Sequence, residues 1–362
     1  MTSIDVMAMM DYGEDANYTS SEENVTFSLE AVFCPHIIDK KGILYTVAVV
    51  FIFIFVIGLV ANSVVIWVNL WTKRVRYETH TYILNLAVAD LFVVITLPVW
   101  VASLVQNEQW PMGEAMCKVT HLIFSVNLFG SIFFLTCMSV DRYISVAFLK
   151  SSNTYKKKAI RWIICIFLWL FAFGVSFPDT YYLQVFTSPH NGDTYCRPAY
   201  PKERFQAWLV GMELVSIILG FAFPFPILAI FCLLLARVVS SSSDQDKKAS
   251  RKIIFSYVIV FLICWLPYHS ILIVDTMYLL KFIPINCTME DFLYVSLHVT
   301  QCLSLIHCCV NPILYSFINK NYRYDLMKAF ISKYSAKTGL TKIVDASKLS
   351  ETDYTALTQT VV

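Results

Sequence analysis

The stretch ILYTVAVVFIFIFVIGLVANSVVIWVNL, residues 43–70, decides the fold class of this chain. It is apolar and long enough to cross the hydrocarbon core of a bilayer, which takes about 20 residues of helix. The amide of Asn62 lies deep inside it, and a polar group at that depth needs a protein partner because lipid offers none. Six further interrupted blocks of this kind follow, at 81–105, 116–148, 160–182, 207–238, 251–280 and 292–318. Together they predict an all-α membrane protein, a seven-transmembrane helix bundle with a polar interior.

Composition and charge distribution agree with a membrane protein and predict its orientation. Of the residues, 57% are hydrophobic and 15% charged, and the mean hydropathy is +0.60, well above a typical soluble domain. The first 39 residues hold eight acidic residues and no Lys or Arg. Basic residues gather in alternate connectors, at 73–76, 156–161, 247–252 and 320–328. The positive-inside rule therefore places the N-terminus outside the cell and the C-terminus in the cytosol.

The chain divides into one membrane domain and its flanking segments. We expect an extracellular acidic tail at 1–41, the seven-span domain at 42–318 and a short amphipathic helix on the cytosolic membrane surface at 319–331. Residues 332–362 are rich in Ser and Thr and are expected to be disordered. Asn17 and Asn24 begin glycosylation sequons on the predicted outer side, which supports the same orientation.

Four of the eleven cysteines fall at predicted extracellular positions, where disulfides persist: Cys34, Cys117, Cys196 and Cys287. Four cysteines allow three pairings. A bridge from Cys117, at the start of the third span, to Cys196 would hold the long loop after the fourth span over the mouth of the bundle. Cys34 and Cys287 would then tie the N-terminal segment to the loop before the seventh span. The other cysteines lie inside spans as apolar fillers, and no metal site is expected.

Asp90 lies in the middle of the second span, where an ionised carboxylate needs a cation or hydrogen-bond donors. Donors on other spans that could converge on it are Asn62, Asn127, Ser131, His307 and Asn311. Two interpretations stay open: a cluster of hydrogen-bonded side chains with a structural role, or a sodium site coupled to conformational change. Asp90, Asn127, Ser131 and Asn311 are the candidate activation or sodium site, and no other cofactor is expected.

Acidic residues also mark the outer ends of three spans. Asp179, Glu213 and Asp275 end the fourth, begin the fifth and end the sixth span, so all three face one mouth. Trp100, Tyr268 and Gln301 add aromatic and amide lining, and Arg197 completes the candidate ligand-binding set. A solvated rim of acids is the alternative. The acidic tail above the same mouth favours a basic polypeptide ligand that is steered in electrostatically.

Three motifs stand at the ends or kinks of particular spans. Asp141-Arg142-Tyr143 ends the third span on the cytosolic side. The sixth and seventh spans each place a helix-breaking proline near aromatic residues, as Cys264-Trp265-Leu266-Pro267-Tyr268 and Asn311-Pro312-Ile313-Leu314-Tyr315. Because proline removes a backbone hydrogen bond and kinks a helix, both sites are natural hinges. We therefore take Asp141, Arg142, Tyr143, Trp265, Pro267, Pro312 and Tyr315 as candidate activation switches.

With these motifs in this order, residues 42–330 resemble the rhodopsin-like class of G-protein-coupled receptors. Within that class, Thr96-Leu97-Pro98, Trp110-Pro111-Met112-Gly113 and His307-Cys308-Cys309 resemble the chemokine receptors. The segments 121–125, 179–183 and 333–340 are similar to an atypical, scavenging chemokine receptor. Most chemokine receptors carry Glu where this chain has Gln301, so this position offers a neutral amide instead of a charge. By analogy, Tyr12 between Asp11 and Glu14 is a sulfation candidate.

The resemblance implies a receptor that binds CXC-type chemokines, which are small basic proteins, at the plasma membrane. It would recruit arrestins after receptor kinases modify its tail, and carry ligand into endosomes with little or no G-protein activation. Phosphates on the tail would form an anionic strip that arrestins read through Arg and Lys clusters. The candidate sites are Ser335, Thr338, Thr341, Ser347, Ser350, Thr352 and Thr355. Membrane lipid and oligomers with itself or with other chemokine receptors are further expected partners.

A conventional chemokine receptor that signals through G proteins in chemotaxis is the main alternative. Such receptors usually follow the Asp-Arg-Tyr triplet with Leu-Ala-Ile-Val, whereas this chain has Ile144-Ser145-Val146-Ala147. Neutral drift in a loop would also explain that difference. A transporter or channel is disfavoured because the sequence shows no paired broken helices and no chain of intramembrane acids. No nucleophile–base pair or metal-ligand spacing indicates an enzyme, and nucleic acid is not an expected partner.

Overall fold

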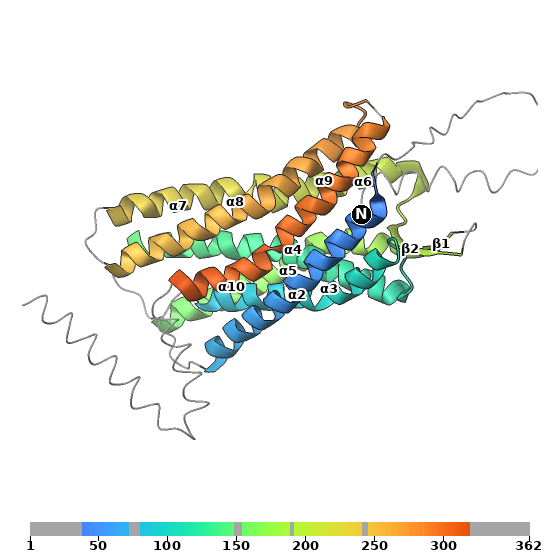
Figure 1. Ribbon diagram of the computed structural model, residues 1–362. Coiled ribbons are helices and arrows are strands. Elements are labelled where there is room, and N and C mark those ends of the chain that lie inside the picture. Colours follow the sequence, from blue (N-terminus) through green and yellow to red (C-terminus); the bar gives the residue numbers. More distant parts are fainter. Residues whose placement is uncertain are drawn as a thin grey trace, which may run out of the picture.

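The computed structural model describes residues 38–71, 80–147, 154–188, 192–240, 245–284 and 286–318. These residues contain seven helical spans that are long and apolar enough to cross a membrane. Figure 1 shows the spans running alongside one another as one elongated bundle. The predicted fold class, an all-α bundle of seven spans, is confirmed. The expected surface helix at 319–331, the tail at 332–362 and residues 1–37 of the N-terminal tail lie outside the described residues.

Five of the spans are single helices and two are composite. The single helices are α2 (Lys40–Trp71), α3 (His80–Val105), α4 (Gly113–Ala147), α5 (Thr154–Tyr182) and α8 (Gln245–Leu279). The fifth span consists of α6 (Phe205–Ile217), η3 (Ile218–Ala222) and α7 (Pro224–Ser240), and the turn η2 (Lys202–Arg204) precedes it. The seventh span consists of α9 (Cys287–Leu305) and α10 (His307–Ile318). The sequence predicted the positions of all seven spans but neither of these subdivisions.

The helices expose apolar side chains on the outside of the bundle and bury polar ones inside. Phe53, Ile163 and Leu170 are 63%, 65% and 68% exposed, as expected for side chains that contact lipid. Asp90 and Ser131 are completely buried. A soluble protein shows the opposite pattern. Here the outside of the bundle faces lipid, whose hydrocarbon tails are as apolar as a leucine side chain. Apolar residues of α4, α5, α7 and α8 fill the core between these polar sites, Phe134, Leu228 and Phe261 among them.

The fifth span loosens into a π-helical turn at η3. The backbone N–H of Phe223 donates to the carbonyl of Ile218, 2.8 Å away and five residues earlier. Pro224 follows at once and has no N–H to donate, so the regular ladder is already interrupted there. Gly220 lies in this turn, where a Cβ atom would stand 2.9 Å from Cε1 of His269. The glycine therefore lets α8 approach the fifth span closely.

The seventh span breaks at Ile306, between α9 and α10, although it has no proline there. Side chains bond the backbone carbonyls of the turn before the break. Ser304 Oγ donates to the carbonyl of Gln301 at 2.8 Å, and His307 Nδ1 hydrogen-bonds with the carbonyl of Ser304. Such local bonds compete with the helical ladder and bend helices.

A two-stranded antiparallel hairpin, β1 (Leu183–Thr187) and β2 (Thr194–Pro198), follows the fourth span. Val185 pairs with Cys196 in its register. The hairpin lies at one end of the bundle, which we call the hairpin end (Figure 1). Its second strand is tied to the segment before α4: the N–H of Trp110 donates to the carbonyl of Thr194, and Thr194 Oγ1 donates back to the carbonyl of Trp110 at 2.9 Å. The sequence did not predict these strands.

Candidate functional site

A cavity of about 250 Å³ lies between the helices at the hairpin end. Six of the seven residues predicted to contact a ligand line it: Trp100, Asp179, Glu213, Tyr268, Asp275 and Gln301. They come from α3, α5, α6, α8 and α9, so the cavity exists only when the bundle is assembled. Arg197 is not among the lining residues. It is buried in β2, with its guanidinium carbon 5.7 Å from the centre of the Tyr195 ring.

The three carboxylates of the cavity stand on three different helices, and two of them are deeply buried. Glu213 is 8% exposed and Asp275 is 1% exposed. Burial of this depth argues against the alternative that these acids are a solvated rim. Glu213 accepts a hydrogen bond from Thr276 Oγ1 at 2.7 Å. Several carboxylates around one cavity create a negative field that low-dielectric walls focus toward its opening.

Asp179 accepts a hydrogen bond from the hydroxyl of Tyr200, which follows strand β2. Burial and the neighbouring Asp179 carboxylate both raise the pKa of Tyr200 far above its ordinary value. The phenol therefore stays protonated and keeps donating. Tyr200 also stacks on Trp208, with ring centroids 5.9 Å apart. This aromatic packing holds the phenol, and the phenol in turn orients one acidic side chain of the cavity.

A second, smaller cavity of about 50 Å³ lies beside the first. Trp100, His121 and Gln301 line both cavities and so form the wall between them. The ring centroids of Trp100 and His121 are 4.7 Å apart in an edge-on arrangement. His121 was not among the residues predicted to line a cavity. Its only signal was its place one helical turn after Cys117, at the outer end of the third span.

Glu108 and His298 form a buried pair that lines the smaller cavity. His298 Nε2 lies 3.5 Å from Glu108 Oε1, and the His298 side chain is 3% exposed. Burial alone would raise the pKa of Glu108, but the hydrogen bond from His298 and the nearby charge of Arg197 lower it to about 2. Glu108 is therefore an anion, and it is a fourth acidic side chain at this end. It was not predicted from the sequence because it lies outside the spans, in the turn after α3.

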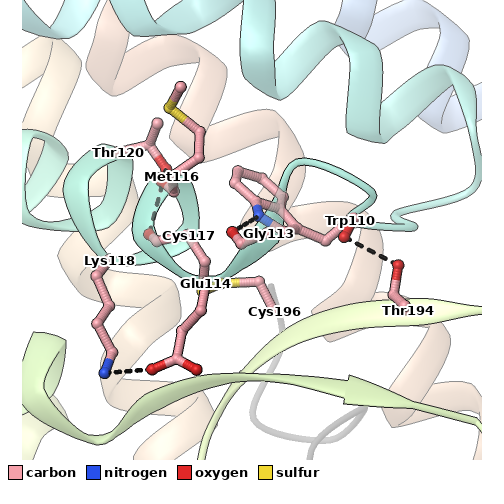
Figure 2. Close-up of a disulfide and its surroundings, with 9 residues drawn as sticks. All are labelled: Trp110, Gly113, Glu114, Met116, Cys117, Lys118, Thr120, Thr194 and Cys196. Atoms are coloured by element: carbon pink, nitrogen blue, oxygen red, sulfur yellow. Dashed lines mark hydrogen bonds and ion pairs between the residues drawn. A yellow bond between two sulfur atoms is a disulfide. The ribbon is translucent and has the colours of Figure 1, made fainter.

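The predicted bridge between Cys117 and Cys196 is present, with Cα atoms 5.9 Å apart. Figure 2 shows that it joins the first turn of α4 to strand β2. The same turn contains the Lys118–Glu114 ion pair at 2.6 Å. The hairpin is thereby fixed beside the cavities. Cys287 is also disulfide-bonded, and its predicted partner Cys34 lies outside the described residues.

Asp90 is the focus of a second polar site, deeper in the bundle. Its Oδ1 accepts hydrogen bonds from Asn127 Nδ2 at 3.0 Å and Ser131 Oγ at 3.3 Å, and its Oδ2 accepts one from Asn311 Nδ2 at 3.2 Å. His307 Nε2 lies 3.3 Å from Oδ1. We call these five residues the Asp90 centre. The predicted set Asp90, Asn127, Ser131 and Asn311 is brought together here.

Asn62 does not join the Asp90 centre through the hydrogen bonds found, contrary to the expectation. Its Nδ2 donates to the carbonyls of Gly58 and Cys308, at 2.9 and 2.8 Å. The amide thus links α2 to the first turn of α10. The physical reason is that these two carbonyls use both N–H groups of the amide, so none is left for the Asp90 carboxylate.

The candidate switches occupy three helices. Asp141, Arg142 and Tyr143 lie in α4, where the Tyr143 ring packs edge-on against Phe231 of α7 with centroids 5.5 Å apart. Pro267 lies inside α8 and Pro312 inside α10. Trp265 is 3% exposed, and its ring centroid is 5.0 Å from that of His307. The side chain of Tyr315 lies outside the described residues.

Comparison with known proteins decides the family. Residues 61–315 match the family described as 7 transmembrane receptor (rhodopsin family). The chain belongs to this receptor family.

The same comparison finds close relatives. Atypical chemokine receptor 3 of Rattus norvegicus is 61% identical over 355 residues, which cover 97% of this chain and 98% of that protein. The Homo sapiens protein of the same name is 60% identical with the same coverage. C-X-C chemokine receptor type 4-A of Xenopus laevis is 33% identical over 284 residues, 78% of each chain. Within the rhodopsin family the chain therefore falls among the chemokine receptors, a non-enzyme family, and the expectation that it is not an enzyme is confirmed.

Some predicted site residues lie outside the described residues. They are the sequon residues Asn17 and Asn24, the sulfation candidate Tyr12, and the tail sites Ser335, Thr338, Thr341, Ser347, Ser350, Thr352 and Thr355. These remain predictions.

Proposed function

We propose that this chain is an atypical chemokine receptor that binds CXC-type chemokines, recruits arrestin and removes ligand from its surroundings, with little or no G-protein activation. One observation carries the ligand class: Asp179, Glu213 and Asp275 line one cavity at the hairpin end. A cavity with this charge is complementary to a basic polypeptide. The names of the relatives, atypical chemokine receptor 3 and C-X-C chemokine receptor type 4-A, point to the same ligand class.

In this proposal the hairpin end faces the outside of the cell. The charge distribution along the chain supports it, since the basic connectors fall at the opposite ends of the spans. The disulfide to Cys196 also suits an oxidising exterior. The acidic tail at 1–41 would capture the ligand first, and the cavity would take its leading basic segment. The receptor would stand in the plasma membrane and cycle through endosomes, glycosylated at Asn17 and Asn24.

The scavenging part of the proposal rests on relatedness and on the cytosolic face. The 61% identity to atypical chemokine receptor 3 is nearly twice that to C-X-C chemokine receptor type 4-A. Ile144, directly after the Asp-Arg-Tyr triplet, is 50% exposed, so it is free to contact a cytosolic partner. A Ser- and Thr-rich tail that receptor kinases phosphorylate would supply the anionic strip for arrestin.

A conventional, G-protein-activating chemokine receptor is the second candidate, because the Asp141-Arg142-Tyr143 triplet itself is intact. One experiment distinguishes these two candidate functions. The full chain is expressed in cells that lack other chemokine receptors, and a panel of CXC-type chemokines is added. Arrestin recruitment, G-protein activation and the loss of chemokine from the medium are measured together, with C-X-C chemokine receptor type 4-A as the signalling control.

We expect arrestin recruitment and ligand depletion without G-protein activation. Robust G-protein activation would overturn the scavenger assignment in favour of the second candidate. Absence of binding by every member of the panel would overturn the chemokine assignment itself.

A further inference from the structure

His269 in α8 is a buried polar side chain whose ring nitrogens are not hydrogen-bonded. It is 1% exposed, and neither Nδ1 nor Nε2 has a partner among the described residues. An imidazole carries at least one N–H group, and a buried donor without an acceptor costs free energy. The ring lines neither cavity at the hairpin end. Direct contact with a ligand in those cavities therefore does not explain it.

One edge of the His269 ring faces the π turn of the fifth span. A Cβ atom on Gly220 would stand 2.9 Å from Cε1 and 3.3 Å from Nε2 of this ring. Because Gly220 has no side chain, the edge lies directly against the backbone of η3. A larger residue in place of the glycine would push the ring away from the turn.

The π turn lacks one backbone donor at the same place. An N–H group at position 224 would bond the carbonyl of Gly220 in an α-helix, or that of Leu219 in a π-helix. That position is Pro224, which has no N–H. One carbonyl of the turn is therefore without its regular donor. An unpaired donor on the sixth span thus neighbours an acceptor on the fifth span, and no hydrogen bond found among the described residues joins them.

Aromatic rings pack against the imidazole on its other sides. Its centroid lies 5.4 Å from that of Phe221, 6.1 Å from that of Trp265 and 5.3 Å from that of Tyr268. Of these residues, Tyr268 lines the larger cavity. A ligand that displaces the Tyr268 ring would therefore change the packing of His269 without contacting it.

We propose that His269 is a poised hydrogen-bond donor between the sixth and fifth spans. The ligand-free chain keeps the ring unpaired, and the ring bonds the carbonyl of the π turn when a ligand in the larger cavity displaces Tyr268. The two arrangements then differ by one buried hydrogen bond. A ligand shifts a conformational equilibrium only through such a difference between two states. The ligand-dependent half of this inference rests on the proposed function, whereas the unpaired ring of the ligand-free chain does not.

Three substitutions of His269 separate the donor from the packing. His269→Leu removes every polar atom at similar volume. His269→Gln places an amide N–H near the position of Nε2, whereas the shorter side chain of His269→Asn places it near Nδ1, away from the turn. Ser270→Ala is the control, because Ser270 is the next residue of α8 but is exposed and donates to the carbonyl of Leu266 at 2.7 Å. Two quantities are measured: the melting temperature of the ligand-free full chain in detergent, and chemokine-dependent arrestin recruitment in cells.

We expect His269→Leu to melt at least as high as the wild type, because the unpaired donor is gone. It should nevertheless need about ten-fold more chemokine for half-maximal arrestin recruitment, because one buried hydrogen bond of the second arrangement is lost. His269→Gln should recruit arrestin like the wild type, and His269→Asn should resemble His269→Leu. Ser270→Ala should match the wild type in both measurements.

A purely structural role would lower the melting temperature and the response together. A His269→Leu variant that melts below the wild type would therefore overturn the proposal. Equal arrestin recruitment by His269→Gln and His269→Asn would overturn it as well, and this pair decides if His269→Leu is not recovered in a folded form. If no chemokine leads the wild type to recruit arrestin, the proposed function fails, and the melting comparison still tests the unpaired ring.

Discussion

The Nε atom of Arg161 in α5 lies 3.1 and 3.0 Å from the two carboxylate oxygens of Asp141 in α4. The Arg161 side chain is 8% exposed and that of Asp141 20%. The acid of the Asp-Arg-Tyr triplet is thus bound to a residue that the sequence assigned to a basic connector. The contact couples the position of the triplet to the start of the fourth span.

Replacing Arg161 by Ala should lower the melting temperature by several degrees. The change leaves a largely buried carboxylate without this donor, at a cost of about 2 kcal/mol for a hydrogen bond to a charged group. Arg161→Lys should recover part of the loss, since it restores charge without the same donor geometry. Thermal melting of the purified chain checks this. Equal melting of Arg161→Ala and the wild type would show that the pair contributes nothing.

Substituting Ala for Cys117 or Cys196 should nearly abolish expression at the cell surface. The bridge holds β2 against α4, and removing a native disulfide costs about 2–5 kcal/mol in small secreted domains. Surface labelling with an antibody against an N-terminal tag measures the effect. The double variant should resemble each single one, because both partners serve one bond. Normal surface expression of either single variant would contradict this role.

Loss of the Cys34–Cys287 bridge should have a milder effect than loss of the first. It would tie a terminal segment rather than the hairpin, so we expect chemokine affinity to fall while surface expression changes little. Chemokine binding to cells that carry Cys287→Ala, normalised to surface expression, checks this. A loss of expression as severe as that of Cys117→Ala would contradict the prediction.

Asp179→Asn and Asp275→Asn should each weaken chemokine binding about ten-fold or more, or at least 1.4 kcal/mol. Each removes one negative charge from the cavity that faces a basic ligand. The wild-type association rate should also fall as salt rises. Glu114→Gln is the control, since Glu114 has a side chain that is 54% exposed and pairs with Lys118. Binding kinetics in a salt series test these outcomes, and a salt-independent rate with normal binding by both variants would contradict them.

The Glu108–His298 pair should stabilise the fold, and this stabilisation should be lost at acid pH. The pKa of Glu108 is lowered from 4.5 to about 2 in the folded chain. A lowered pKa means that the contribution is present above about pH 4.5 and is lost as the pH falls toward 2. The melting temperature of the wild type should therefore exceed that of Glu108→Gln at pH 5, and the difference should shrink below pH 4.5. A difference that does not depend on pH would show that the carboxylate charge plays no part.

Replacing the tail Ser and Thr residues from Ser335 to Thr360 by Ala should sharply reduce arrestin recruitment, because the anionic strip cannot form. Chemokine affinity should stay unchanged, since the cavity lies at the other end of the bundle. Ligand uptake need not fall in proportion if the receptor cycles constitutively. Arrestin recruitment and equilibrium binding, measured in the same cells, separate these effects. Full arrestin recruitment by the Ala-substituted tail would contradict the prediction.

The membrane architecture could be read from the sequence because lipid imposes a local rule. Every span must form its backbone hydrogen bonds within one helix and present apolar side chains to hydrocarbon. Each span can therefore be recognised from its own stretch of residues. The block predicted at 81–105 corresponds to α3, His80–Val105, and that at 43–70 to α2, Lys40–Trp71. Six of the seven candidate ligand-binding residues line one cavity, since acids and aromatics at the outer ends of spans have one mouth to face.

Only the assembled bundle decided which side chains meet. The Asp141–Arg161 and Glu108–His298 pairs each join residues from separate elements, and neither carries a signal in its own neighbourhood. The hairpin, the π turn at η3 and the break at Ile306 likewise depend on packing, because they exchange regular backbone bonds for tertiary contacts. The sequence by itself determined that Asp90 needs a partner in the membrane. That the partners are Asn127, Ser131, His307 and Asn311 was decided by the tertiary structure, because these side chains stand on α4 and α10, which meet α3 only in the assembled bundle.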